Sequence, residues 1–239
     1  MNQEKKIKLL LGTAYLLIVF VFLWFFFSNF SIKDFSSYEL IKINRDTLEE
    51  LKNSNILISC TIFFLGTVIW VFLLGFGSPI LLVSGFIFGK WLGTLLAAFG
   101  LSVGASLLYI FANYFLKDIV HKKFSSKFNN LTDKFKKNEF VFFLIYRFVG
   151  GIPFFISNIL PTIFNVKLKN FFFGSLLGMT PQIFIGVSLG SGLNKILEEN
   201  SKLPSFFDLL FTPDIYLPIF GLIVLVVFGL ILRKKFIVN

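Results

Sequence analysis

The chain has 239 residues, of which 56% are hydrophobic and only 15% charged. This composition is too apolar for an ordinary soluble domain, and the length suffices for several membrane crossings. The 23 Lys and Arg residues outnumber the 13 Asp and Glu residues, but they cluster beside apolar segments, where lipid head groups rather than nucleic acid are the natural partner. We therefore predict a multi-pass integral membrane protein that binds membrane lipids and no nucleic acid.

The first uncharged stretch runs from Leu9 to Ile32 and follows three lysines. It is about twice as long as the apolar core of a signal peptide and lacks a small-residue cleavage pattern. We therefore expect a retained N-terminal transmembrane helix over residues 1–32. A polar connector with a short helix is expected over residues 33–55.

The next apolar run, from Asn53 to Leu116, contains a single charged side chain, Lys90. Gly77 and Pro79 interrupt this run. In lipid every backbone polar group needs an internal partner, so such a break is tolerated only where it packs against protein or lines a cavity. The break is therefore a candidate site.

The segment after this break is too short to cross a bilayer. A helix over Ile80–Phe88 would rise about 14 Å, roughly half of a ~30 Å hydrocarbon core. We expect a half-helix that turns back near Gly89, which makes this segment a re-entrant hairpin.

The central connector, Lys117 to Glu139, carries seven lysines. Four apolar residues are spaced to fall on one helical face: Phe124, Phe128, Leu131 and Phe135. This pattern predicts an interfacial amphipathic helix, with a solvated loop as the alternative. The lysines here and the basic residues at the C-terminal end of the chain predict that both lie on the cytoplasmic side.

A second interrupted apolar zone begins at Phe140 and contains Arg147. Its breaks fall at Gly150, Gly151, Pro153 and Pro161. The same length arithmetic predicts a second re-entrant hairpin. Placing an arginine in a membrane helix costs about 2.5 to 3.5 kcal/mol, so some interaction must offset the cost of Arg147.

The two zones correspond at an offset of 74 residues. The matching pairs are Gly77 with Gly151, Pro79 with Pro153, Phe99 with Phe173, Gly100 with Gly174, and Gly104 with Gly178. Paired interrupted segments in corresponding halves of a chain indicate a transport site, and we interpret them as an internal repeat. The repeated Gly-xxx-Gly spacing predicts close helix packing at Gly100, Gly104, Gly174 and Gly178.

The predicted fold is an all-α polytopic membrane protein with an internal repeat of a re-entrant helical hairpin plus a spanning helix. The membrane core covers residues 56–194 and a loop covers 195–214. A C-terminal transmembrane helix with a basic tail covers residues 215–239. The oligomeric state is left open, and a homo-oligomer is compatible with the sequence.

No acidic side chain falls within the uncharged stretches. A proton-coupled carrier, a metal-dependent enzyme and an acid-base enzyme all need such groups within the membrane. The sequence has one histidine, and its one cysteine, Cys60, lies in an apolar segment. We therefore expect no enzymatic activity, no cofactor and no metal site.

Arg147 is the principal candidate for binding a lipid phosphate. Pro153 suits the first turn of a new half-helix, whose backbone N–H groups would face an anion beside the guanidinium. Asn158 could add a side-chain donor, and Lys90, near the tip of the first hairpin, is a second candidate phosphate contact. The alternative is that Arg147 extends toward water or Glu139 at the membrane surface.

At these residues the chain resembles the DedA-like, SNARE-associated Golgi protein superfamily, whose shared VTT domain has paired re-entrant hairpins. The resemblance covers roughly Ile56 to Gly192. It is carried by Gly77-Ser78-Pro79, Gly85 to Gly89 followed by Gly93, the Gly100 and Gly104 helix, Arg147, Gly151-Ile152-Pro153-Phe154, Asn158, and Gly174 to Pro181.

The resemblance implies a role in moving lipids between leaflets, since members of the superfamily are implicated in moving phospholipids or polyprenyl-phosphate carriers. It maps the family arginine of the second hairpin onto Arg147, and the proline and asparagine onto Pro153 and Asn158. The acidic residues that DedA proper carries around its first hairpin have no counterpart here. This departure weakens the case for proton coupling and points to the subgroup closer to the Golgi and transmembrane members.

We therefore predict a non-enzymatic lipid translocator, a scramblase or flippase-like protein, in the bacterial plasma membrane. One alternative is a secondary transporter of a small anion. Another is a membrane organiser that recruits partners through its basic connector.

Overall fold

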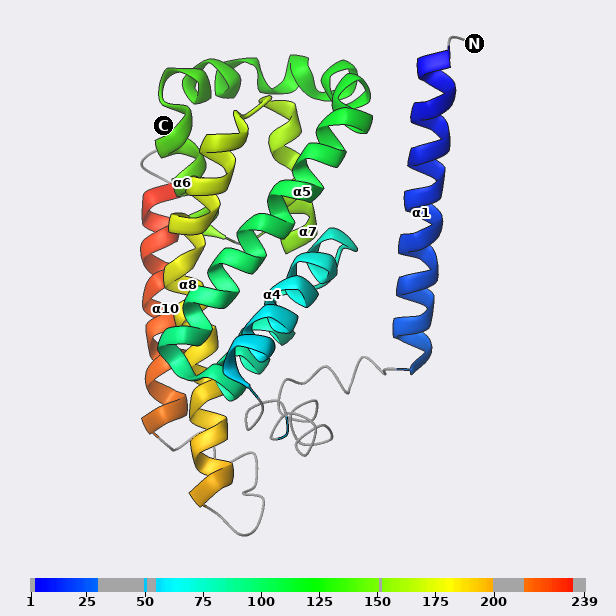
Figure 1. Ribbon diagram of the computed structural model, residues 1–239. Helices are drawn as coiled ribbons and strands as arrows, with labels where there is room; N and C mark the ends of the chain where they lie inside the picture. Colours follow the sequence, from blue (N-terminus) through cyan, green and yellow to red (C-terminus); the bar gives the residue numbers. More distant parts are fainter. Residues whose placement is uncertain (1–2, 30–49, 51–54, 151, 200–212, 234–239) are drawn as a thin grey trace.

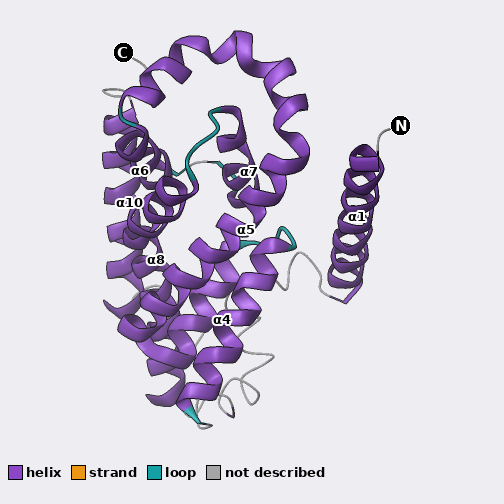
Figure 2. Cartoon of the chain, turned by 45° about the horizontal axis from the view of Figure 1, so that its top comes forward, coloured by secondary structure: helices purple, strands orange, loops and turns teal. Residues whose placement is uncertain are grey.

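The computed structural model describes residues 3–29, 50, 55–150, 152–199 and 213–233. Every secondary-structure element within these residues is helical (Figure 2). The helices are α1 (Gln3–Asn29), α4 (Ile56–Phe72), α5 (Gly77–Lys137), α6 (Glu139–Val149), α7 (Phe154–Ile159), the 3-10 helix η2 (Leu160–Ile163), α8 (Leu168–Glu199) and α10 (Pro213–Arg233). Gly151, the basic tail after Arg233, most of the predicted connector 33–55 and most of the predicted loop 195–214 lie outside the described residues.

Three of these helices are long and apolar enough to cross a membrane. They contain the candidate spans Lys6–Phe25, Gly77–Phe115 and Leu168–Lys195. The prediction of an all-helical, multi-pass integral membrane protein is therefore confirmed at this level.

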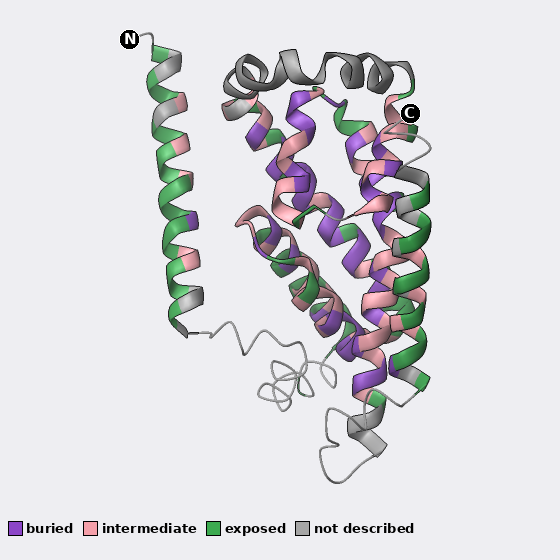
Figure 3. Cartoon of the chain, turned by 180° about the vertical axis from the view of Figure 1, so that it is seen from behind, coloured by how far each residue is buried: buried purple, intermediate pink, exposed green. Residues whose placement is uncertain are grey.

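Helices α5 and α8 form the centre of the bundle. They pack against each other, while α4 packs on α5, and α6 and α10 pack on α8 (Figure 1). The largest buried cluster lies between them and includes Leu101, Phe143, Phe171 and Val187. Buried residues accordingly face the middle of the bundle, and exposed residues cover its outer side (Figure 3).

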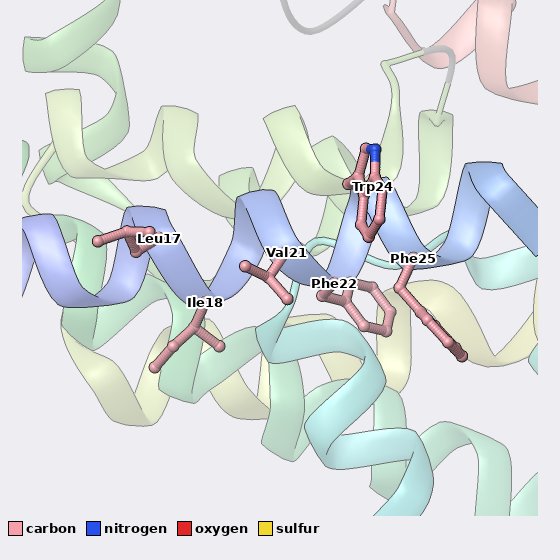
Figure 4. Close-up of a pocket in the computed structure, with 6 residues that line it drawn as sticks. All are labelled: Leu17, Ile18, Val21, Phe22, Trp24 and Phe25. Atoms are coloured by element: carbon pink, nitrogen blue, oxygen red, sulfur yellow. The ribbon is translucent and has the colours of Figure 1, made fainter.

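Helix α1 lies at the edge of the bundle (Figure 1) and contacts it through Tyr15, whose hydroxyl donates to the Phe72 carbonyl at 2.7 Å. One side of α1 carries an open groove of about 510 Å³ (Figure 4). The groove is lined by Leu17, Ile18, Val21, Phe22, Trp24 and Phe25. None of these side chains is charged, so the groove suits lipid acyl chains rather than a head group.

Helix α5 turns sharply near its start. Gly89 adopts φ 70° and ψ 179°, a left-handed φ that favours glycine, and the residues on either side are helical. Across this turn the Ser84 hydroxyl donates to the Gly93 carbonyl at 2.7 Å. Residues 77–88 therefore fold back toward the helix that follows, at the position where the sequence predicts the end of a half-helix.

The second interrupted zone differs in detail from its prediction. Helix α6 ends at Gly150, which has φ 63°. Pro153 is the N-cap of α7 rather than a residue of its first turn, and α7 has only six residues. Pro161 lies near the start of η2, where its missing N–H is tolerated, two residues after the α-helix α7 ends at Ile159.

The glycines of the first Gly-xxx-Gly pair lie where α5 approaches α4. A methyl carbon added at Gly100 would lie 2.9 Å from Cγ2 of Thr67, and one added at Gly104 would lie 2.8 Å from Cβ of Val71. Both distances are shorter than van der Waals contact, so these positions require glycine for the observed helix separation.

The second pair has the same relation to α6. A methyl carbon at Gly174 would lie 2.7 Å from Cδ1 of Phe143, and one at Gly178 would lie 2.7 Å from the carbonyl oxygen of Leu144. In each half, therefore, a glycine pair on the long helix packs against the helix that precedes the break.

The two halves meet where residues 77–88 cross α8. A methyl carbon at Gly85 would overlap the carbonyl oxygen of Val187 and lie 2.7 Å from the Ser191 nitrogen. One at Gly190 would overlap the Leu82 carbonyl. The two backbones are therefore in direct contact at this crossing.

Glu139 closes the N-terminal end of α8. Its Oε1 atom accepts from the Lys167 backbone N–H and from Nδ2 of Asn170, both at 2.7 Å. The carboxylate therefore satisfies a backbone donor next to the start of the helix and favours its dipole.

We expect Glu139→Ala to lower the free energy of unfolding by about 0.5 to 2 kcal/mol, the usual range for loss of a helix cap. Glu139→Gln, which keeps a side-chain oxygen, should lose less. Thermal unfolding of the purified variants in detergent tests this. Equal midpoints for wild type and Glu139→Ala would contradict the capping role.

Candidate functional site

The Arg147 side chain is buried in the bundle, with only 4% of its surface exposed. It lies in the last turn of α6, just before the turn at Gly150. The sequence allowed an arginine extended toward the membrane surface, but the structure shows its guanidinium in the protein interior. The polar end reaches other protein groups instead of water, so that alternative is wrong for this structure.

Two serine hydroxyls accept hydrogen bonds from the guanidinium. Nε donates to Ser175 on α8 and Nη1 donates to Ser157 on α7, both at 2.9 Å. The Ser157 hydroxyl in turn donates to the Phe154 carbonyl at 2.7 Å. The arginine therefore joins three helices at one point.

Aromatic rings surround the remaining surface of the guanidinium. Its carbon lies 4.9 Å from the ring centroid of Phe171, 5.2 Å from that of Phe143 and 6.0 Å from that of Tyr146. Ring faces at this distance attract a cation and offset part of the cost of burial. The Phe143 and Phe171 rings are also stacked on each other at 4.9 Å.

One end of the guanidinium remains unpaired. Nη2 of Arg147 is buried and has no hydrogen-bond partner. No carboxylate is among the contacts that the described residues make with Arg147, and Glu139 binds the start of α8 instead. The site therefore holds a positive charge without a negative partner and has N–H groups available for an anion.

Gln182 on α8 supports the end of α6. Its Nε2 atom donates to the carbonyl oxygen of Phe148 and, at 3.5 Å, to that of Arg147. A methyl carbon at Gly150 would lie 3.3 Å from this nitrogen. Gln182 thus satisfies carbonyls that the helix end leaves free, next to the arginine.

The other predicted phosphate contacts occupy different surroundings. Asn158 is fully buried, follows the arginine's partner Ser157, and has no partner for either amide atom. Lys90 is an exposed residue directly after the turn at Gly89 and is not among the contacts of Arg147. Asn158 is therefore adjacent in sequence to Ser157, which binds Arg147. Lys90 is not part of that site.

Sequence reasoning missed Ser157, Ser175 and Gln182. Serine and glutamine hydrogen-bond across membrane helices in many settings, so their types alone give no signal. Two of them adjoin residues that the sequence did select, because Ser157 precedes Asn158 and Ser175 follows Gly174. Within the part of the chain that the structure describes, no group of three or more His, Cys, Asp or Glu residues could hold a metal ion.

These features define a multi-pass helical membrane protein with a hydrogen-bonded arginine and no acidic partner at its candidate site. Residues 76–192, about half of the chain, match the family model of the VTT domain. The chain belongs to the VTT-domain superfamily, and the resemblance to the DedA-like proteins is confirmed. The matched segment begins just before α5 and ends within α8, so it includes Arg147 and all of its described partners.

The relatives extend this result. The chain is 27% identical over 136 residues to the transmembrane protein 41 homolog of Caenorhabditis elegans. This aligned part covers 54% of this chain and 55% of the relative. It is 29% identical over 119 residues to YqeD of Bacillus subtilis, covering 48% and 57%. With transmembrane protein 41B of Mus musculus it shares 25% identity over 134 residues, covering 53% and 46%. The chain thus spans about half the length of the curated relatives it matches, and no solved structure matches it.

Proposed function

We propose that this protein is a non-enzymatic lipid translocator that moves phosphate-bearing head groups between leaflets. Arg147 and its unpaired Nη2 atom carry this proposal. A guanidinium binds phosphate through two N–H groups at once, and here one N–H group is unpaired while others bind only serine hydroxyls. A phosphate can replace a neutral hydroxyl as the partner of a cation at a gain in electrostatic energy.

The proposed mechanism uses two re-entrant half-helices. The non-helical glycines Gly89 and Gly150 support it, because each interrupts a helix that packs on the long apolar helix α8. The parallel packing of the two glycine pairs supports an internal repeat. In this proposal the halves thin the barrier, the head group passes Arg147, and the acyl chains stay in the bilayer.

The neighbours of Arg147 set how it would bind. Ser157 belongs to the six-residue helix α7, and in this proposal its bond to Nη1 is the one that a phosphate replaces. Ser175 lies within the long helix α8 and holds Nε in place. Asn158 adds a donor in this proposal, whereas Lys90, which is exposed, serves as an outer contact for head groups.

We also propose that the protein resides in the bacterial plasma membrane, with the central connector and the C-terminal end in the cytoplasm. Similarity to YqeD of Bacillus subtilis supports the first part. The excess of lysines in the connector supports the second.

Reconstitution tests the proposed function. Purified protein in liposomes should speed the exchange of fluorescent phospholipid or polyprenyl phosphate between leaflets well above the rate of protein-free liposomes. Equal rates with and without protein would refute translocation. Uptake of a water-soluble anion by the same liposomes, without lipid exchange, would instead support a small-anion transporter.

A further inference from the structure

Two residues of the segment formed by α7 and η2, Asn158 and Thr162, carry unpaired polar atoms into the interior. Both side chains are 0% exposed. The amide oxygen and nitrogen of Asn158 and the hydroxyl of Thr162 have no hydrogen-bond partner among the described residues. Buried polar atoms are almost always paired, because an unpaired one costs the full price of its desolvation. These atoms therefore need a partner that the chain itself does not supply.

The two residues lie close together along one segment. Asn158 is in α7 and Thr162 is in the 3-10 helix η2, which follows α7 directly, so only four positions separate them, little more than one helical turn. Both α7 and η2 pack on α5. The unpaired atoms of Asn158 and Thr162 therefore belong to neighbouring turns of a buried segment.

This group is separate from the guanidinium but adjoins it. Arg147 binds Ser157, the residue before Asn158, and successive side chains on a helix diverge by about 100°. Asn158 therefore lies on a side of α7 next to the side that Arg147 contacts. Because neither side chain has a hydrogen-bond partner among the described residues, no described carboxylate, lysine or histidine binds the pair.

We propose that Asn158 and Thr162 form a subsite that binds a hydroxyl group. The amide offers one donor group and one acceptor, and the threonine hydroxyl is both donor and acceptor. An anion would satisfy only the donors and an ammonium group only the acceptors, whereas a hydroxyl pairs with both kinds. The hydroxyl belongs either to bound water or to a head group whose phosphate is on Arg147, and the second source rests on the proposed function.

Thermal unfolding of the purified protein in detergent tests the subsite without any translocation assay. In Thr162→Val the methyl group replaces a hydroxyl of equal size, and Asn158→Leu removes the amide at similar volume. If a hydroxyl occupies the subsite, these changes remove hydrogen bonds, and each variant should unfold at least about 2 to 4 °C below wild type. An unchanged or higher midpoint would show that the atoms sit unpaired in a dry core and would overturn the proposal.

Thr61→Val is the matched control. Thr61 is exposed on α4, and its hydroxyl donates to the Leu57 carbonyl of its own helix at 2.8 Å. The same chemical change there should leave the midpoint within about 1 °C of wild type, since surface substitutions have small effects. If Asn158→Leu gives no folded protein, the isosteric Thr162→Val variant alone decides the outcome.

Two fluorescent lipids distinguish the sources of the hydroxyl. Phosphatidylglycerol and phosphatidylethanol carry the same phosphodiester charge, but only phosphatidylglycerol has free hydroxyls. A head-group hydroxyl in the subsite predicts that Thr162→Val slows phosphatidylglycerol at least threefold more than phosphatidylethanol. Equal slowing, or none, together with a lowered unfolding midpoint assigns the subsite to water. If wild type moves neither lipid, translocation fails as a function while the unfolding comparison still decides the subsite.

Discussion

Arg147→Met is expected to slow head-group translocation about tenfold or more, since a hydrogen bond to a charged group is worth about 1.5 to 3 kcal/mol and 1.4 kcal/mol is a factor of ten. Methionine has a similar length and an apolar surface, so it can fill the space beside the stacked rings of Phe143 and Phe171. It removes the charge and every N–H group. The measurement is the rate of fluorescent lipid exchange in liposomes that contain equal amounts of folded protein.

The stability of Arg147→Met separates a binding role from a structural one. Replacing a buried charge with an apolar side chain of similar volume is often neutral or stabilising. We therefore expect slow translocation with an unfolding midpoint equal to or above that of wild type. Arg147→Lys keeps a charge but lacks the planar guanidinium that reaches Ser157 and Ser175 together. Its translocation rate should therefore lie between those of wild type and Arg147→Met. Wild-type rates in Arg147→Met would remove Arg147 from the phosphate site and leave translocation itself standing.

The second large effect is expected at the crossing between residues 77–88 and α8. Gly85→Ala and Gly190→Ala each place a methyl group against a backbone carbonyl of the opposite helix. Backbone atoms cannot move aside as a flexible side chain can, so the helices must separate. We expect the free energy of unfolding to fall by about 3 kcal/mol or more, at the upper end of overpacking costs. Thermal unfolding and the yield of monodisperse protein in detergent measure this.

Gly66→Ala in α4 is the matched control. A methyl group at Gly66 meets no atom within 4 Å. Alanine is favoured over glycine in a helix by about 0.8 to 1.0 kcal/mol, so this variant should be as stable as wild type or more stable. If Gly85→Ala unfolds at the same temperature as Gly66→Ala, the backbone contact at the crossing is not present in the folded protein.

Several features of the fold follow from local sequence. Long runs without charge predict membrane helices because a charged side chain is costly in hydrocarbon. Gly77 is the first residue of α5, while Gly150 after α6 and Gly89 at the sharp turn have the positive φ that glycine adopts most readily. Arg147 could be selected because an arginine in an apolar run is rare enough to require a partner.

The prediction was less accurate where contacts between distant segments decide the outcome. Pro161 lies where α7 gives way to the 3-10 helix η2 and is buried there, and the proline alone does not specify that burial. The alternative in which Arg147 extends toward water or Glu139 is not seen, because Glu139 instead binds Lys167, 28 residues later, next to the start of α8. Neither outcome has a local signal, because each depends on which helix end lies nearby.

The sequence by itself determined the membrane class, the superfamily, the positions of the glycine turns and the choice of Arg147. Each of these depends on residue type and spacing along one segment. Only the tertiary structure decided that the guanidinium points inward to Ser157 and Ser175, that Nη2 stays unpaired, and that Asn158 and Thr162 are buried with unpaired polar atoms. The physical reason is that hydrogen bonding and burial depend on the packing of α6, α7 and α8 against each other, and spacing along the chain does not specify that packing.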